Sequence, residues 1–268
     1  MSAVPRVLSI AGTDPSGGAG IQADLKTFSA LGAYGMTVVT ALVAQTTTGV
    51  TGIHEVPAEF VAQQLDTLLT DVPADAVKIG MLGNAELIKA VAGALDVYGP
   101  AYVVLDPVMV AKSGDRLLPA DAVTALRETL LPRADLITPN LPEAADLLGE
   151  APAGSLAEMR AQAGRLRALG ARQVLLKGGH LDGDTCVDVL ATPEGTVELA
   201  APRVDTRNTH GTGCTLSSAI AALRPRHDDW PGAVRAAKQY LTGALLAADD
   251  LDVGHGHGPV HHFHAIWK

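Results

Sequence analysis

Short apolar runs alternate along the chain with longer segments in which apolar residues recur every three or four positions. The short runs predict β-strands at 7–10, 36–43, 76–79, 102–105, 136–138 and 174–176. The periodic segments predict helices, the clearest of them at 21–31, 59–69, 215–223 and 230–250. This alternation is typical of βαβ units. The sequence therefore predicts an α/β fold with a mainly parallel central sheet that is flanked by helices on both faces.

One segment departs from this alternation. Residues 185–200 contain two β-like runs on either side of the turn-forming residues 192–195, which predicts a small β-hairpin. The most linker-like stretch, 151–154, is too short to divide the chain. We therefore expect residues 1–268 to form a single domain.

Composition and charge exclude several classes of function. The formal net charge is −9 and aromatic residues make up 3% of the chain, which argues against nucleic-acid binding. No apolar run reaches the roughly 18 residues of a membrane span, and the first residues do not resemble a signal peptide. The two cysteines, Cys186 and Cys214, are too few for a disulfide framework, and Cys186 lies in a β-like run where a structural role is favoured. We expect a cytoplasmic protein.

A glycine-rich loop at 11–20 joins the first predicted strand to the first predicted helix. It lacks the lysine and hydroxyl residue of a P-loop, and no acidic residue follows the second strand as a dinucleotide site requires. The loop therefore predicts a close approach of backbone to a ligand or an ordinary tight turn. Asp24, in the following helix, is either a polar anchor for a ligand or a partner of the helix dipole.

The strongest local signal is a run of small, flexible residues that leads directly into an apolar helix. The backbone N–H groups of Gly211, Thr212 and Gly213 can form a cradle for an anion. Cys214 would lie at the mouth of this cradle, where a helix N-terminus lowers a thiol pKa. The pattern favours a general base or nucleophile, and the alternative is a small buried thiol.

Three further loops place polar side chains at the ends of predicted strands. Asp106 and Glu143 can hold Mg²⁺ there, partly through water molecules. Lys177, which two glycines follow, can present its charge to a phosphate. Each residue also has a simpler interpretation, such as a turn or a cap for a helix at 142–148. Together with the cradle, however, they supply what phosphoryl transfer requires.

Two other features have open interpretations. Gln45 can offer an amide donor and acceptor to a planar heterocycle, or it can simply be solvated. The tail at 255–264 is rich in histidine, but Pro259 separates His257 from His261 and breaks any helix that would align them. We therefore expect no metal site in the tail.

Several of these motifs together resemble one known family. They are the segments 11–27, 78–81, 106–109, 138–140, 177–180 and 210–214. In this order they resemble the hydroxymethylpyrimidine/phosphomethylpyrimidine kinases of thiamine biosynthesis, which are members of the ribokinase superfamily. The similarity extends from about residue 7 to residue 263, and the tail also resembles the end of that family. It implies a ribokinase-like homodimer that uses ATP and Mg²⁺. It also implies two reactions, which phosphorylate 4-amino-5-hydroxymethyl-2-methylpyrimidine and then the resulting monophosphate.

The resemblance also implies roles for individual residues. The residues implied to line the pyrimidine pocket are Gly12, Asp24, Gln45, Met81 and Val108. The residues implied to form the catalytic anion hole are Gly211, Thr212, Gly213 and Cys214, with Cys214 near the reacting hydroxyl. Those implied to serve Mg-ATP are Asp106, Asn140 and Glu143, and those implied to contact its phosphates are Lys177, Thr212 and Lys238.

Three alternatives remain open at this point. The nearest is a pyridoxal kinase of the same superfamily, because pyridoxal is also an aromatic heterocycle with a hydroxymethyl arm. A dinucleotide-dependent oxidoreductase would use the glycine-rich loop, although the acidic residue that it needs is missing. A cysteine-based sensor would use Cys214 without catalysis.

Overall fold

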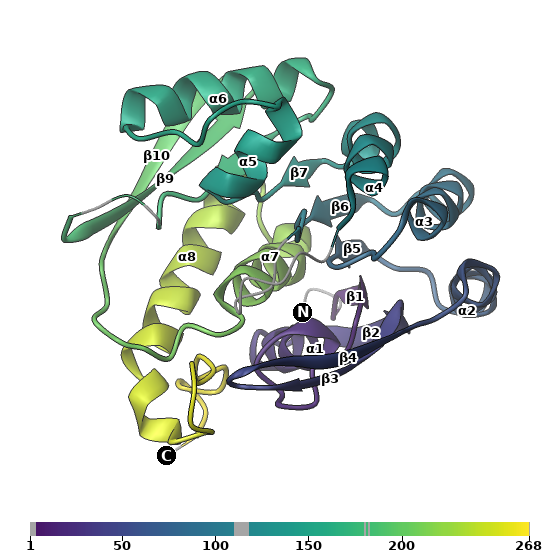
Figure 1. Cartoon of the computed structure of the whole chain (residues 1–268), viewed down its shortest axis with the longest axis horizontal. Helices are drawn as coiled ribbons and strands as arrows, with labels where there is room; N and C mark the ends of the chain where they lie inside the picture. Colours follow the sequence, from purple (N-terminus) through teal and green to yellow (C-terminus); the bar gives the residue numbers. More distant parts are fainter. Residues whose placement is uncertain (1–3, 110–117, 180, 182, 268) are drawn as a thin grey trace.

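The computed structural model describes residues 4–109, 118–179, 181 and 183–267. In this part of the chain, eight strands form one sheet in the order β10-β9-β8-β7-β6-β5-β1-β2 (Figure 1). The strands of the parallel region are β1 (Arg6–Ala11), β2 (Tyr34–Val39), β5 (Ala76–Ile79), β6 (Tyr102–Leu105), β7 (Leu136–Ile137) and β8 (Val174–Leu176). The antiparallel edge consists of β9 (Thr185–Thr192) and β10 (Gly195–Pro202).

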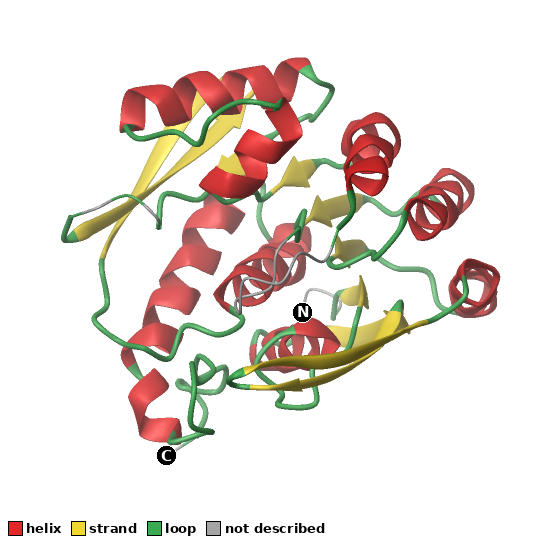
Figure 2. Ribbon diagram, viewed as in Figure 1, coloured by secondary structure: helices red, strands yellow, loops and turns green. Residues whose placement is uncertain are grey.

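Helices cover both faces of this sheet (Figure 2). On one face lie α2 (Ala58–Asp71), α3 (Ala85–Tyr98), α4 (Ala120–Ala125) with the turns η1 (Leu126–Leu130) and η2 (Leu131–Arg133), α5 (Leu141–Leu148) and α6 (Leu156–Ala168). On the other face lie α1 (Gly20–Ala30), α7 (Thr212–Leu223) and α8 (Trp230–Leu246), with the short turns η3 (Arg224–Arg226) and η4 (Ala248–Leu251) after α7 and α8.

The strands are buried on both faces, which explains their nearly continuous apolar sequences. In β1, Leu8 and Ile10 pack into the core beneath α2 and α3, whereas Val7 points to the core shared with α1 and α7. This alternation follows from the two-residue repeat of a strand. The predicted α/β architecture with a mainly parallel sheet is confirmed.

The predicted strand at 36–43 is wrong, because the chain leaves the main sheet at Thr40. The Thr40 N–H donates to the Ala11 carbonyl, and its hydroxyl donates to the Met81 carbonyl at 2.8 Å. After this point β3 (Ala41–Thr46) pairs with β4 (Gly49–Glu55) as a separate two-stranded antiparallel sheet.

The predicted hairpin at 185–200 is present as β9 and β10, and it extends to Pro202. It does not stand apart, because β9 pairs antiparallel with β8 and so continues the main sheet. The small separate hairpin is therefore the one formed by β3 and β4. Within the described ranges, no helix is both long and apolar enough to cross a bilayer.

Candidate active site

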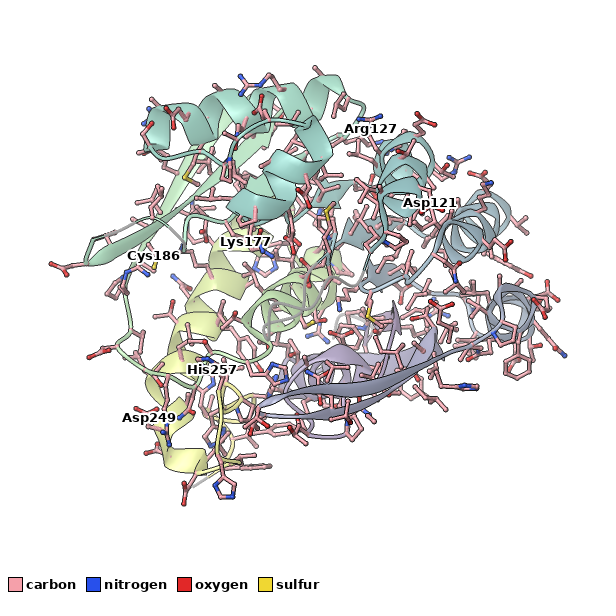
Figure 3. All side chains as sticks on the ribbon, viewed as in Figure 1. Asp121, Arg127, Lys177, Cys186, Asp249 and His257 are labelled. Atoms are coloured by element: carbon pink, nitrogen blue, oxygen red, sulfur yellow. The ribbon has the colours of Figure 1, made fainter. Side chains whose placement is uncertain are left out.

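The loops that follow the parallel strands meet at the N-terminus of α7. A Cβ atom built on Gly213 would lie 3.4 Å from Lys177 Nζ and 3.5 Å from Asp106 Oδ2. Ser217, one turn further along α7, donates to Asp106 Oδ2 at 3.3 Å. Figure 3 shows Lys177 near the ends of α5 and α7, whereas Cys186 lies further out on β9. The structure therefore brings an acid, a lysine and the predicted anion cradle together.

The cradle itself is held in an unusual backbone conformation. Gly211 caps α7 with a φ of 78°, and a Cβ atom on it would lie 1.7 Å from the Gly18 carbonyl oxygen. The glycine-rich loop is thus packed directly against the cradle. Among the described residues, the N–H groups of Gly213 and Cys214 have no backbone or side-chain oxygen as acceptor. Unpaired donors at a helix N-terminus are suited to an anion.

Asp106 is an ionised carboxylate at the base of this site. Its Oδ1 accepts from Lys177 Nζ at 3.1 Å and from Thr138 Oγ1 at 3.0 Å. Burial raises the pKa of Asp106, but the charges of Lys177 and Lys78 and these hydrogen bonds lower it further than burial raises it. The pKa of Lys177 is raised in turn, because attraction to the carboxylates outweighs its burial.

Glu143 and Asn140 form a capping box at the start of α5. Asn140 N–H donates to Glu143 Oε2 at 2.8 Å, and Glu143 N–H donates to Asn140 Oδ1 at 2.8 Å. Glu143 therefore caps this helix, as the simpler interpretation of this residue expected, and its role toward Mg²⁺ stays a prediction. Burial, together with the negative charge of Asp106, raises the pKa of Glu143 to about 7, although Lys177 opposes the rise.

The donor set near Lys177 fits a Mg²⁺ ion that keeps part of its water shell. Lys177 Nζ lies 3.1 Å from Asp106 Oδ1 and 3.9 Å from Glu143 Oε2, so both carboxylates already face one cationic centre. No cluster of three or more His, Cys, Asp or Glu side chains suitable for a metal occurs in the described ranges. Mg²⁺ is commonly held by one or two carboxylates, with water and substrate phosphates as the other ligands.

Cys214 lies in the first turn of α7, as expected, but the expected low thiol pKa is wrong for the free protein. Burial raises the pKa of Cys214 to about 11, and the negative charges of Asp24 and Asp106 add to this effect. The positive charge of Lys78 and the Gly20 N–H act in the opposite direction without reversing it. The helix N-terminus therefore does not overcome desolvation, and Cys214 is a neutral thiol near pH 7.

Asp24 lies beneath the cradle and does not face an open pocket. Its carboxylate is fully buried and receives two hydrogen bonds from Lys78 Nζ, at 2.9 and 3.0 Å. Ser9 Oγ and Ser218 Oγ donate to it at 2.5 and 2.6 Å. These donors hold both carboxylate oxygens, and the expected place of Asp24 in the lining of the pyrimidine pocket stays a prediction.

Lys238 is also committed to an internal partner. Its Nζ lies 2.5 Å from Asp188 Oδ2 and 3.2 Å from the Cys186 carbonyl oxygen, both on β9. In the free protein, the ammonium that is expected to bind phosphate is therefore paired with the Asp188 carboxylate. The other oxygen of Asp188 accepts from Gly178 N–H at 2.9 Å, which ties this pair to the loop after Lys177.

The remaining expected pocket residues lie on neighbouring segments. A Cβ atom on Gly12 would come within 2.7 Å of Met81 Cε, so these two residues are in direct contact. Val108 is half-buried in the loop after Asp106. Gln45 is half-buried at the end of β3, with its amide nitrogen 3.4 Å from His210 Nε2. Their contact with a pyrimidine stays a prediction.

The comparisons with known proteins decide the family. The phosphomethylpyrimidine kinase family matches residues 14–261. The chain belongs to this family. It is 59% identical over 260 residues to the hydroxymethylpyrimidine/phosphomethylpyrimidine kinase of Escherichia coli, covering 97% of this chain and 98% of that protein. The corresponding enzyme of Rhizobium meliloti is 55% identical over 261 residues, with the same coverage.

Solved structures of vitamin kinases share the fold of this family member. An ADP complex of Bacillus subtilis pyridoxal kinase superposes with a TM-score of 0.92 at 36% identity, covering 99% of this chain and 100% of that one. A phosphomethylpyrimidine kinase from Clostridium difficile gives a TM-score of 0.80 at 41% identity, covering 90% and 99%. The predicted family and ribokinase-like fold are confirmed.

The local sequence does not reveal a hydrogen bond that joins the glycine-rich loop of this kinase family member to its cradle. Asp14 Oδ2 lies 2.7 Å from His210 Nε2, and both side chains are buried. The C-terminal tail holds His210 from the other side, because His210 N–H donates to the Gly258 carbonyl at 3.0 Å. The Asp-Pro-Ser-Gly turn was the available signal, but its partner lies 196 residues away. His180, part of the lysine loop, is outside the described residues.

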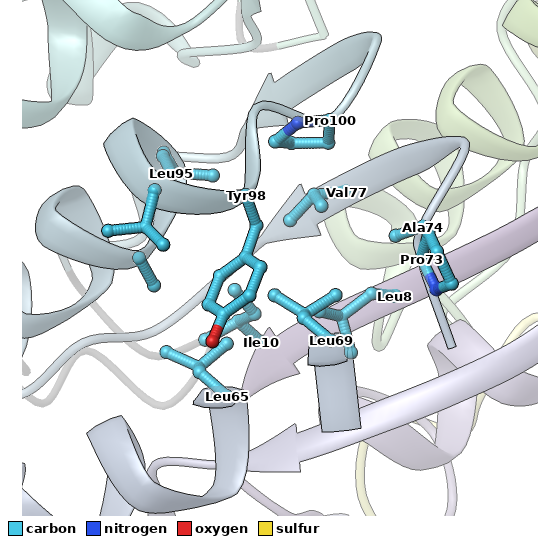
Figure 4. Close-up of a pocket in the computed structure, with 12 residues that line it drawn as sticks. Leu8, Ile10, Leu65, Leu69, Pro73, Ala74, Val77, Leu95, Tyr98 and Pro100 are labelled. Atoms are coloured by element: carbon cyan, nitrogen blue, oxygen red, sulfur yellow. The ribbon is translucent and has the colours of Figure 1, made fainter. Parts of the chain in front are cut away.

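A cavity of about 210 Å³ lies at the opposite ends of the strands, between α2 and α3 (Figure 4). Tyr98 projects toward Leu65 and Ile10 there, and Pro73 and Pro100 precede β5 and β6. No acidic or basic side chain is among the described residues that line it. It does not contribute to the site at the carboxyl ends of the strands.

Proposed function

We propose that this chain transfers a phosphoryl group from ATP to the hydroxymethyl arm of 4-amino-5-hydroxymethyl-2-methylpyrimidine and then phosphorylates the monophosphate to the diphosphate, in thiamine biosynthesis. The observation that carries the proposal is the cradle of unpaired N–H groups beside Asp106 and Lys177. It occurs in a chain that is 59% identical, over nearly its whole length, to an enzyme with that name.

Mg-ATP would supply the phosphoryl group and part of the charge neutralisation. Asp106 and Glu143 are suited to hold the metal, and Lys177 is suited to contact the transferred phosphoryl group. The N–H groups of Gly213 and Cys214 can stabilise negative charge that develops on its oxygens. Two further residues are expected to contribute from the starts of α5 and α7: Asn140 to the binding of Mg-ATP and Thr212 to that of its phosphates.

Lys238 can join this phosphate site only after a change in its partner. Its ammonium would have to exchange Asp188 for a phosphate oxygen. We therefore assign Lys238 to ATP binding in the loaded enzyme and to an internal ion pair in the free one.

The acceptor pocket would be formed by Gly12, Gln45, Met81 and Val108, with Cys214 near the reacting hydroxyl. A neutral thiol is compatible with this reaction, because a largely dissociative transition state requires little deprotonation before attack. The monophosphate is already ionised near neutral pH and needs no base. One cradle can then serve both steps.

A product-resolved assay tests the proposal. We expect ADP release with the pyrimidine alcohol and Mg-ATP, and both phosphorylated products after separation. Asp106→Asn provides a matched site variant, which should lose activity while it retains the shape of the side chain. Turnover by Asp106→Asn at the wild-type rate would refute the placement of the site.

Pyridoxal kinase is the second candidate. The Bacillus subtilis pyridoxal kinase and this chain share 36% identity and a TM-score of 0.92. The ratio of kcat/KM for the two alcohols, measured side by side, separates the possibilities. We expect the pyrimidine to be preferred and pyridoxal to be at most a side substrate, and exclusive use of pyridoxal would reverse the assignment.

We further propose that residues 1–268 act as one catalytic domain in a cytoplasmic homodimer. The main sheet draws strands from both halves of the chain, and both cysteines are free thiols. Leu42 and Ile53, which are 52% and 46% exposed, provide an apolar face on the β3–β4 hairpin that a second copy can cover. Light scattering of the wild type and of Leu42→Asp tests this, and a monomeric wild type would overturn it.

A further inference from the structure

His210 connects the glycine-rich loop to the residue predicted to read the pyrimidine. Its Nε2 atom lies 2.7 Å from Asp14 Oδ2 and 3.4 Å from the amide nitrogen assigned to Gln45. Asp14 itself is rigidly held, because Oδ1 accepts from the N–H and hydroxyl of Ser16 at 2.9 and 2.7 Å. Its Oδ2 also accepts from Ala19 N–H at 2.8 Å.

These contacts determine which atom of His210 carries a proton. Burial raises the pKa of Asp14, but the bonds from His210 and Ser16 lower it to about 2, so Asp14 is ionised at neutral pH. An ionised carboxylate only accepts hydrogen bonds. The contact of 2.7 Å therefore requires a proton on His210 Nε2, directed at Asp14.

A protonated Nε2 atom cannot accept a hydrogen bond from the amide of Gln45. With the amide nitrogen 3.4 Å away, two donors would face each other. The oxygen and nitrogen of an amide have nearly the same shape, and their assignment follows from their hydrogen-bond partners. Rotating the Gln45 amide by a half-turn removes this contact between two donors. Its oxygen then faces the positive end of the Nε2–H group, which still donates to Asp14, and its NH₂ group turns away from His210.

We propose that Asp14 and His210 are positioning residues that fix the Gln45 amide with its NH₂ group directed at the acceptor pocket. This inference rests on the proposed function, in which Gln45 contacts the pyrimidine. An NH₂ group in a fixed direction selects a heterocycle that presents a ring-nitrogen lone pair, as an unprotonated aminopyrimidine does. A ring that presents N–H or C–H at the same place leaves the amide donor unpaired, which lowers binding roughly 10-fold or more.

Steady-state kinetics of a double-mutant cycle tests this arrangement. His210→Gln keeps an N–H donor near the position of Nε2, and His210→Met removes the donor at similar volume. Each is combined with Gln45→Ala, and KM is measured for the pyrimidine alcohol and for ATP. We expect His210→Met to raise KM for the pyrimidine by about 10-fold, with ATP little changed, and His210→Gln to recover most of the loss.

The coupling between the two residues distinguishes positioning from simple support of the fold. In the Gln45→Ala background, His210→Met should have no further effect on KM for the pyrimidine. An equal effect with and without the Gln45 side chain would overturn the proposal.

A second readout does not require turnover. Nitrogen NMR of the free protein should show a proton on His210 Nε2, and Asp14→Asn should weaken that preference. An unprotonated Nε2 in the wild type would overturn the proposal directly. Failure of the wild type to phosphorylate the pyrimidine would instead refute the proposed function, while the NMR result would still decide how the Gln45 amide is oriented.

Discussion

Replacing Lys78 by methionine tests the buried ion pair beneath the cradle. Lys78 and Asp24 have no solvent exposure, and the ammonium lies 2.9 and 3.0 Å from the two carboxylate oxygens. In Lys78→Met, the Asp24 carboxylate keeps the hydroxyl donors Ser9 and Ser218 but loses its counterion. Removing one partner of a buried pair typically costs about 3–5 kcal/mol. That is a large part of the ~5–15 kcal/mol that stabilises a typical protein.

Urea unfolding at neutral pH, followed by circular dichroism, measures this loss. The double variant Lys78→Met/Asp24→Asn removes the stranded charge, so it should recover a substantial part of the lost free energy of unfolding. Arg6→Met provides a matched control, because Arg6 and Asp75 form a partly exposed pair at 2.8 Å. Its effect should be much smaller, since solvent screens such pairs. A loss for Lys78→Met no larger than that for Arg6→Met, or a double variant less stable than Lys78→Met, would show that the unpaired Asp24 charge is not what destabilises the variant.

Four further perturbations test other parts of the site. Glu143→Gln should raise the Mg²⁺ concentration needed for half-maximal activity, and full wild-type activity in excess EDTA would contradict the metal assignment. Burial lowers the pKa of His262 to about 3 in the folded protein. As the pH falls below about 6.5, His262 therefore takes up a proton in the unfolded chain but not yet in the folded one. The free energy of unfolding should then fall by up to ~1.4 kcal/mol per pH unit below about pH 6.5, and His262→Gln should show a shallower fall; equal slopes would refute this. Gly211→Ala should abolish activity, because its methyl group would collide with the backbone of the glycine-rich loop, and an active enzyme would contradict this close packing. Gly93→Ala is the control: its methyl group meets no atom within 4 Å, so it should stabilise α3 by about 0.5–1 kcal/mol. The absorbance of the Cys214 thiolate, measured as the difference between the wild type and Cys214→Ala, should appear with a midpoint near pH 11. A midpoint below the ordinary thiol pKa would instead support Cys214 as a general base.

Much of the sheet could be predicted because its strands are buried on both faces. The strands at 76–79, 102–105 and 174–176 were predicted to the residue, since mainly apolar runs, interrupted only by Lys78 in the first of them, end there at glycine or at polar residues. The break at Thr40 was not predictable from the pattern. Apolar residues lie on both sides of Thr40, and the chain turns away because Thr40 binds backbone groups of two distant segments.

The candidate site could be predicted in position but not in its charge states. The carboxyl ends of parallel strands share one edge, so Asp106 and Lys177 were expected to meet there. The thiol pKa of Cys214 depends on burial and on charges from three other elements, none of which the local sequence reveals. For the same reason the partners of Asp24 and Lys238, 54 and 50 residues away, were not predicted.

A single-turnover time course with the pyrimidine alcohol, Mg-ATP and excess enzyme shows whether one site carries out both phosphorylations. We expect the monophosphate to form first and then to be converted to the diphosphate, with one ATP consumed in each step. Asp106→Asn should block both steps, because both use the same cradle and phosphate site. Failure of the wild type to form the monophosphate, or formation of both products by Asp106→Asn at the wild-type rate, would show that this site does not catalyse the two steps.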